Sequence, residues 1–228
     1  MDVPVWIPAA IVPSLGSIHD SDVSIMIKRM GTIEPLPFDQ YEALTELLWQ
    51  SFGDDPYLRY LLGQHDRTIR DLLALRLRVQ AQTQQPILVL RNFQGQIQGA
   101  ALYAEPKDEV SLSVFLRYMV QFLLQGRWRL VWRLSDSFRR IEAVRRQSPS
   151  HYYLTLLVVI PEAQGQGYGT QLIEAIHRLS EADGRSQGVW LETDVTDNLG
   201  WYERFGYQQL EGIPIADLQM IALFRPNP

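Results

Sequence analysis

The amino-acid sequence predicts one α/β domain, in which helices cover both faces of a central sheet. Two observations predict this class. Strand-like runs alternate with amphipathic helical runs between residue 23 and the C-terminus. In addition, the β-branched and aromatic run 152–160 leads through alternate glycines into a helical repeat of apolar residues. Residues 1–22 contain three prolines and little periodicity, so we expect an irregular extension there, followed by a single domain at 23–228.

The composition is that of an ordinary globular domain. Of the 228 residues, 46% are hydrophobic and 21% charged, which is enough for a sizeable core. The formal net charge of −5 gives no global sign of nucleic-acid binding, and we expect no nucleic-acid partner. The chain has no cysteine, which excludes disulfides, thiolate metal sites and a cysteine nucleophile. The four histidines are scattered, and we expect no metal site.

Membrane insertion and secretion are not indicated by the sequence. No segment has the length and purity of a transmembrane span. The N-terminus lacks the basic region that precedes the apolar core of a secretory signal. We therefore expect a cytoplasmic protein with no integral membrane segment.

The N-terminal half is expected to begin with a strand and three helices. Residues 23–30 alternate apolar and polar side chains, as in an edge strand. Asp39, with Glu42 three residues later, predicts a capping box at a helix start. The dipeptide Asp55-Pro56 predicts a second helix, because proline is favoured at the first helical position. Asp66 is expected to cap a third helix.

The remaining strands follow from β-branched and aromatic runs bounded by turn residues. They are expected at residues 86–91, 97–105, 151–160, 189–193, 207–210 and 218–224. The first two of these should form a hairpin, and the last two should flank a turn at Ile213-Pro214. A helix should follow Gly169, and a short helix should begin at Asp197 or Asn198 and end at Gly206.

A basic aromatic segment at 110–147 is expected to form a helical insertion of two helices broken at Gly126. It holds eight arginines against Asp136 and Glu142, with six aromatic residues interleaved. Amphipathic helices usually pack their apolar side chains on a core, and we favour that interpretation. A wall of a substrate pocket, a dimer surface, and a membrane or nucleic-acid surface remain alternatives.

The glycine-rich turn 165–169 lies where a strand gives way to a helix. The first amides of a helix lack intrahelical partners and carry the positive end of its dipole, and glycine lets a phosphate approach them. The turn has no lysine, which excludes a Walker loop. A dinucleotide fingerprint fails as well, because Thr170 or Leu172 stands where the third glycine is required.

A third pattern fits. The sequence VIPEAQGQGYG at 159–169 resembles the V-x-P-x-x-Q-x-x-G-x-G signature of the GCN5-related N-acetyltransferases (GNAT). Downstream, Asn198, Tyr202 and Phe205-Gly206-Tyr207 resemble the family's N-x-x-x-Y-x-x-x-G-F/Y segment. The phrases HYYL, LET and NLGWYERFGY look most like the puromycin N-acetyltransferase-like branch. The resemblance implies a mixed sheet that is splayed between its fourth and fifth strands, here 151–160 and 189–193.

The resemblance also implies a binding site for acetyl-CoA. By this resemblance, the contacts come from strand amides, turn amides and one face of a short helix: Leu157, Val158, Val159, Gln164, Gly165, Gln166, Gly167, Tyr168, Gly169, Thr170, Asn198 and Tyr202. Tyr202 would be the general acid for the leaving thiolate. Glu192 or His151 could accept the proton of the amine, although an exposed amine can also lose it to solvent.

These residues lead to a hypothesis about function. The chain is expected to transfer acetyl from acetyl-CoA to a primary amine of a small molecule. Without cysteine, a cysteine-bound acetyl intermediate is impossible, and direct transfer in a ternary complex is the simpler scheme. A non-catalytic module that senses acyl-CoA and an acetyltransferase for protein amines are the alternatives. Whether the chain forms a homodimer is left open.

Overall fold

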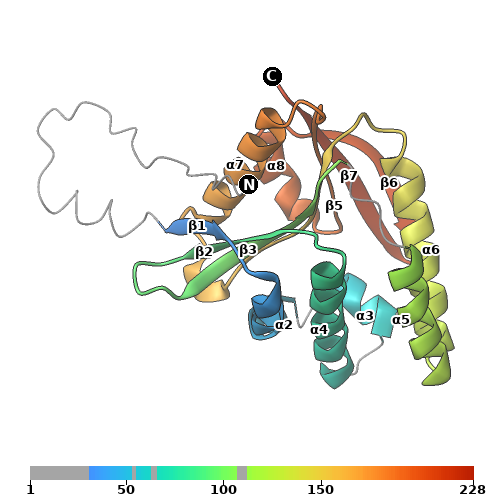
Figure 1. Ribbon diagram of the computed structural model, residues 1–228. Coiled ribbons are helices and arrows are strands. Elements are labelled where there is room, and N and C mark those ends of the chain that lie inside the picture. Colours follow the sequence, from blue (N-terminus) through green and yellow to red (C-terminus); the bar gives the residue numbers. More distant parts are fainter. Residues whose placement is uncertain (1–30, 53–54, 63–65, 107–111) are drawn as a thin grey trace, which may run out of the picture. The chain divides into compact units, whose positions relative to one another are not determined.

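The computed structural model describes residues 31–52, 55–62, 66–106 and 112–228. The expected extension 1–22 and the expected strand 23–30 lie outside these residues. The described part of the chain forms a seven-stranded sheet in the order β1-β2-β3-β4-β5-β7-β6 (Figure 1). Neighbouring strands are antiparallel except for the parallel pair β4–β5. The predicted mixed α/β sheet is therefore confirmed.

The strands are β1 Thr32–Pro35, β2 Ile87–Arg91, β3 Ile97–Ala104, β4 Tyr152–Val159, β5 Gly188–Thr193, β6 Gln208–Ile215 and β7 Leu218–Pro226. The α-helices are α2 Thr45–Phe52, α3 Pro56–Leu62, α4 Asp66–Gln82, α5 Leu112–Leu124, α6 Trp128–Arg145, α7 Tyr168–Ala182 and α8 Leu199–Glu203. Three short 3-10 helices complete the described elements: η1 Phe38–Leu44, η2 Pro161–Ala163 and η3 Thr196–Asn198. No helix in the described part is long and apolar enough to cross a membrane.

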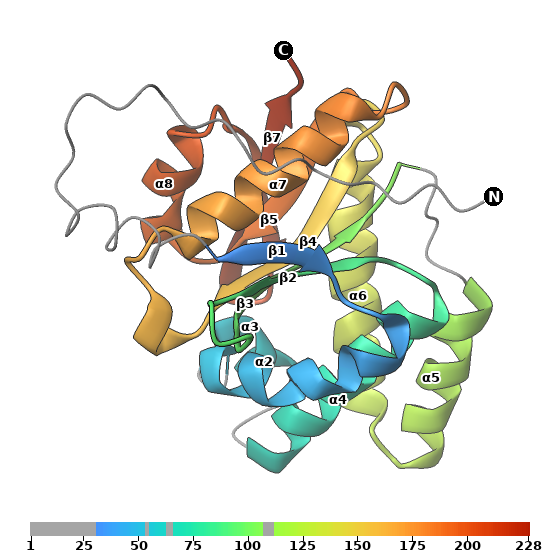
Figure 2. The ribbon, with the colours of Figure 1, turned by 60° about the vertical axis from the view of Figure 1, so that its left-hand side comes forward.

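Helices cover both faces of the sheet because its strands carry apolar side chains on both sides. In β2, Leu88 and Leu90 belong to the core beneath α7, whereas Ile87 and Val89 belong to the core beneath α2 and α4. This is the two-residue alternation of a strand that is buried on both faces. In β5, Trp190 points to a third core, which it shares with α6. Figure 2 shows α7 and α8 on one side of the sheet and α2, α4 and α6 on the other.

Two local expectations were wrong. The segment that begins at Phe38 is the 3-10 helix η1, its N-terminus has no side-chain cap, and Glu42 instead binds Arg78 of α4. Glu42, the second residue of the expected capping box, therefore makes a tertiary ion pair and does not cap the helix. The predicted turn at Pro214 is absent as well, because β6 continues through it to Ile215. β6 is an edge strand of the sheet, where proline is tolerated, and the chain reverses at Ala216 with a φ of 52°.

The helical insertion before β4 is confirmed as the two helices α5 and α6, which are separated at Gly126. The expected packing of its aromatic side chains holds for Phe122, which is buried, but not for Trp128 and Trp132, which are 61% and 63% exposed. Several arginines of α6 pair with its two carboxylates. Asp136, for example, accepts hydrogen bonds from Arg139 and Arg140.

Gly188 provides a test of the close packing at the start of β5. A Cβ at this position would lie 2.3 Å from the carbonyl oxygen of Arg225 and 2.5 Å from the ring of Phe224. We expect Gly188→Ala to lower the free energy of unfolding by about 1–3 kcal/mol, because the β7 backbone would have to move. Gly184→Ala is the control, since its Cβ would meet no atom within 4 Å. Urea unfolding of both variants checks this, and equal midpoints would contradict the packing at Gly188.

Candidate active site

The sheet opens between β4 and β5. The two strands pair only at Tyr152–Val189 and Tyr153–Trp190. Beyond these pairs β4 continues along β3, whereas β5 continues along β7. From Thr155 onward, β4 therefore has no paired residue of β5 in the described part of the chain. The predicted splay between the fourth and fifth strands is confirmed.

A β-bulge in β4 accompanies the separation. Leu154 pairs with Tyr103 and Leu156 pairs with Leu102, so that Thr155 is an extra residue between two consecutive positions of β3. Its hydroxyl donates a hydrogen bond to the carbonyl oxygen of Leu102 at 3.1 Å. Because a bulge bends its strand and increases the local twist, Thr155 gives a physical reason for β4 to leave β5 at this point.

The turn after β4 presents the N-terminus of α7. Gly165 and Gly167 have φ values of 73° and 84°, a left-handed conformation that glycine adopts without strain. Gly167 is the N-cap of α7, and no side chain caps the helix there. The side-chain amide of Gln164 donates a hydrogen bond to the carbonyl oxygen of Val159, and that of Gln166 donates to the carbonyl oxygen of Glu162. The first amides of α7 therefore keep their capacity to bind an anion.

A cavity of about 470 Å³ lies where β4 and β5 separate. Helices α3 to α6 and the diverging ends of β4 and β5 line it. Among the residues expected at the site, Leu157, Glu192, Asn198 and Tyr202 line this cavity. The turn residues 164–170 lie outside the lining. A Cβ at Gly169 would instead stand 3.6 Å from the ring of Trp201, which shows that α8 packs directly against the start of α7.

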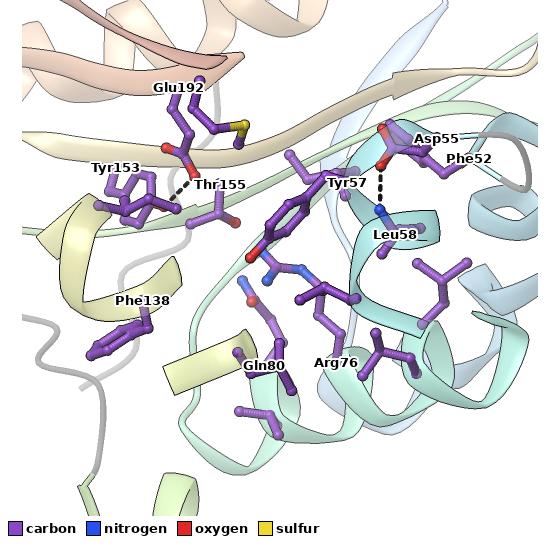
Figure 3. A pocket seen from close by; sticks show the side chains of 18 of the residues that line it. Phe52, Asp55, Tyr57, Leu58, Arg76, Gln80, Phe138, Tyr153, Thr155 and Glu192 are labelled. Atoms are coloured by element: carbon purple, nitrogen blue, oxygen red, sulfur yellow. Dashed lines mark hydrogen bonds between the residues drawn. The ribbon is translucent and has the colours of Figure 1, made fainter. Parts of the chain in front are cut away.

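Glu192 is the carboxylate that β5 presents to the cavity. One of its oxygens accepts a hydrogen bond of 2.7 Å from the hydroxyl of Tyr153, as Figure 3 shows. The other oxygen is buried and has no hydrogen-bond partner among the described residues. Burial raises the pKa of Glu192 to about 7, although the hydrogen bond from Tyr153 and the charge of Arg76 act in the opposite direction. A carboxyl group with this pKa can both accept and release protons near neutral pH.

Tyr202 comes from α8 and reaches the same cavity. Its ring contacts Trp201 and Tyr207 edge to face, with centroids 5.0 and 5.6 Å away. Burial, together with the charge of Glu192, raises the pKa of Tyr202 to about 12. The phenol is therefore protonated at neutral pH and available as a donor. Asn198 precedes it by one helical turn and lines the cavity as well.

His151 is the one residue of the expected catalytic set that does not reach the cavity. It is buried at the start of β4, where its ring packs against Trp190 and Phe224. One ring nitrogen lies next to the carbonyl oxygen of Pro149 and the other next to Arg145. Burial lowers the pKa of His151 below its usual value. These contacts are those of a core side chain.

Besides Glu192, five charged residues line the cavity: Asp55, Arg76, Glu142, Arg145 and Asp194. Asp55 precedes α3 and accepts a hydrogen bond of 2.8 Å from the amide of Leu58. Burial raises the pKa of Asp55 to about 6, and the charge of Asp194 adds to this effect. Arg76 projects from α4, and Figure 3 shows its guanidinium beside the ring of Tyr57. The sequence gives Arg76 no motif, because distant elements bring it to the cavity.

Comparisons with known proteins bear on this arrangement. Residues 130–209 match the model of a family described as the acetyltransferase (GNAT) domain. They include most of α6, the splayed strands, the glycine turn and α8. The fold is the GNAT fold. No curated protein matches the chain in sequence.

Several solved structures share the GNAT fold over most of the chain. A structure from Corynebacterium glutamicum, titled histone acetyltransferase HPA2 and related acetyltransferase, is 20% identical and covers 87% of this chain and 97% of its own, with a TM-score of 0.59. Polyamine N-acetyltransferase from Drosophila melanogaster is 16% identical, with a TM-score of 0.58 and coverage of 86% and 98%. The mosquito protein named arylalkylamine N-acetyltransferase like 5b is 14% identical, with a TM-score of 0.58. The match covers 86% of this chain and 100% of the mosquito chain.

The raised pKa of Glu192 makes a prediction about stability. The unfolded carboxyl group titrates near 4.5 and the folded one near 7, so the folded state binds more protons between these values. Stability should therefore fall as the pH rises through this window, by a total on the order of 3 kcal/mol from this group.

Glu192→Gln cannot titrate and should remove that dependence. We expect the variant to gain stability relative to the wild type between pH 5 and pH 8, measured by urea unfolding. A stability difference that is the same at both pH values would contradict the burial of a titrating Glu192.

Proposed function

We propose that the chain is an N-acetyltransferase that moves acetyl from acetyl-CoA directly to a primary amine of a small molecule. The observation that carries this proposal is that Glu192 and Tyr202 line one cavity at the point where β4 and β5 separate. One group is suited to accept a proton and the other to donate one near neutral pH. The proposal gives His151 no part in the reaction, because its contacts lie in the core.

The residues present fit acetyl-CoA as the donor. The β4 backbone at Leu157, Val158 and Val159 lies beyond the last pair with β5, so an extended pantetheine arm could bind along it. The turn amides from Gln164 to Thr170 would hold the pyrophosphate at the N-terminus of α7. A Cβ at Gly165 or Gly167 would meet no atom within 4 Å, which supports open space around this part of the turn.

The reaction assigned to these groups balances its protons. Glu192 takes one proton from the ammonium group, directly or through water, and leaves a nucleophilic amine. The nitrogen forms a bond to the thioester carbon, and the bond from that carbon to sulfur breaks. Tyr202 gives its proton to the sulfur, and the second proton lost by the nitrogen restores Tyr202. Because the chain has no cysteine, no acetyl-cysteine stage is included.

Structural neighbours are named as acetyltransferases of polyamines, arylalkylamines and agmatine, which supports a small amine as the acceptor class. The puromycin-type branch stays a hypothesis that rests on short sequence phrases. A non-catalytic acyl-CoA sensor is the second candidate, and the partly buried, protonated Tyr202 in the cavity weighs against it.

Tyr202→Phe tests the proposed acid. The ring contacts with Trp201 and Tyr207 remain, so the variant should fold and bind acetyl-CoA as the wild type does. Loss of the proton donor should lower kcat by roughly 10²- to 10⁴-fold, with a much smaller change in the KM for acetyl-CoA. Single-turnover measurements are the appropriate readout, because slow product release could mask a slower chemical step.

Tyr207→Phe is the matched control. It removes the phenol hydroxyl of the neighbouring ring, whose oxygen lies 3.1 Å from Nε2 of His177. Tyr207 does not line the cavity. The variant's single-turnover rate should stay within about threefold of the wild-type rate, since Tyr207 makes no contact with the reacting atoms. Equal rates for Tyr202→Phe and the wild type would remove Tyr202 from the mechanism.

A further inference from the structure

The cavity has an acidic end. Glu192 lies near the end of β5 and Asp194 directly follows this strand, and each has a buried oxygen with no hydrogen-bond partner among the described residues. Asp55 lies directly before α3, close enough to Asp194 for the charge of Asp194 to raise the pKa of Asp55. An ammonium group placed here would supply the hydrogen-bond donors that these oxygens lack.

The rest of the cavity wall is largely apolar. Three helices contribute side chains that could contact a hydrocarbon. They include Leu72 and Leu75 of α4, Met119 and Phe122 of α5, and Leu134 and Ile141 of α6. Met119 and Phe122 are buried parts of the core that joins α5 and α6 to α3 and α4. The helical insertion thus forms the pocket wall that the sequence left as one alternative. An apolar wall stabilises a bound hydrocarbon in proportion to the area that it removes from water.

The cations of the cavity oppose a second positive charge on the ligand. Arg145 binds Glu142 on its own helix at 2.7 Å. The Nε of Arg76 is buried without a hydrogen-bond partner in the described part, and the guanidinium stands in the cavity (Figure 3). Beyond the acidic end, a second ammonium would meet this guanidinium, the apolar wall, or the carboxylate of Glu142, which Arg145 already pairs. The guanidinium and the apolar wall both disfavour a cation.

We propose that the acceptor is a primary amine with one ammonium group and an extended apolar body, such as an alkylamine or arylalkylamine. The amine lies among Asp55, Glu192 and Asp194, and the apolar body lies against α4, α5 and α6. This inference rests on the proposed acetyl transfer and adds a substrate class to it. It separates the chain from acetyltransferases whose acceptors carry a positive charge at both ends.

A homologous series of amines tests the inference on the wild-type protein. Free thiol released from acetyl-CoA is measured with linear monoamines of two to eight carbons and with the diamines of the same lengths. We expect kcat/KM for the monoamines to rise about three- to fourfold per methylene until the cavity is filled. A diamine should have a value roughly tenfold or more below that of the monoamine of equal length, because its far ammonium would be desolvated.

Leu75→Glu adds a carboxylate to the apolar wall. Leu75 lines the cavity from α4 and is only partly buried. We expect the preference for octylamine over 1,8-diaminooctane to fall by roughly tenfold in this variant, with the KM for acetyl-CoA unchanged. Leu116→Glu is the control, because it makes the same change at a half-exposed position of α5 outside the cavity lining. Its preference should equal that of the wild type.

The outcomes separate this inference from the proposed function. Thiol release that does not depend on chain length, or that is faster with diamines, would overturn the apolar monoamine and leave acetyl transfer intact. No amine-dependent thiol release with any member of either series would overturn both. The wild-type series decides the question even if Leu75→Glu does not fold.

Discussion

The short pairing between β4 and β5 is the constraint on which the site depends. Only two residue pairs join the strands, and the bulge at Thr155 follows immediately. A longer parallel ladder would satisfy the β4 backbone with β5 and leave no edge for an extended ligand. The same separation lets the end of β5 point into a cavity rather than into a neighbouring strand. The proposed donor site and the acceptor cavity both follow from this separation of β4 from β5.

The alternation of side chains along β5 then positions the chemistry. Val189 and Leu191 face the core beneath α7, whereas Trp190 faces α6. Glu192, two residues after Trp190, lies on that second face, where it lines the cavity beneath the helices. Its raised pKa is a consequence of this burial. The helical insertion therefore does more than cover the sheet, because it removes water from the carboxylate and supplies the apolar wall.

The sequence predicts the fold well where a signal is local. The glycine turn, Tyr202 and the strands on either side of the splay follow from residue patterns within about sixty positions of one another. It fails where tertiary contacts decide the outcome. Glu42 pairs with α4 instead of capping a helix, and His151 packs into the core. Asp55 and Arg76 enter the cavity from elements far from β5 in the sequence, and no periodicity or motif joins Arg76 to Glu192.

Binding of acetyl-CoA at the turn before α7 is the most direct test of the account. Calorimetry should compare the wild type with Gly167→Asp, which adds a negative charge at the proposed pyrophosphate site. Aspartate tolerates the left-handed φ of 84°, and its Cβ would meet no atom within 4 Å, so the variant should fold. Gly184→Asp adds the same charge after the other end of α7. The account predicts that Gly167→Asp weakens binding by roughly a hundredfold or more, whereas Gly184→Asp leaves it unchanged. Wild-type affinity in folded Gly167→Asp would contradict the account.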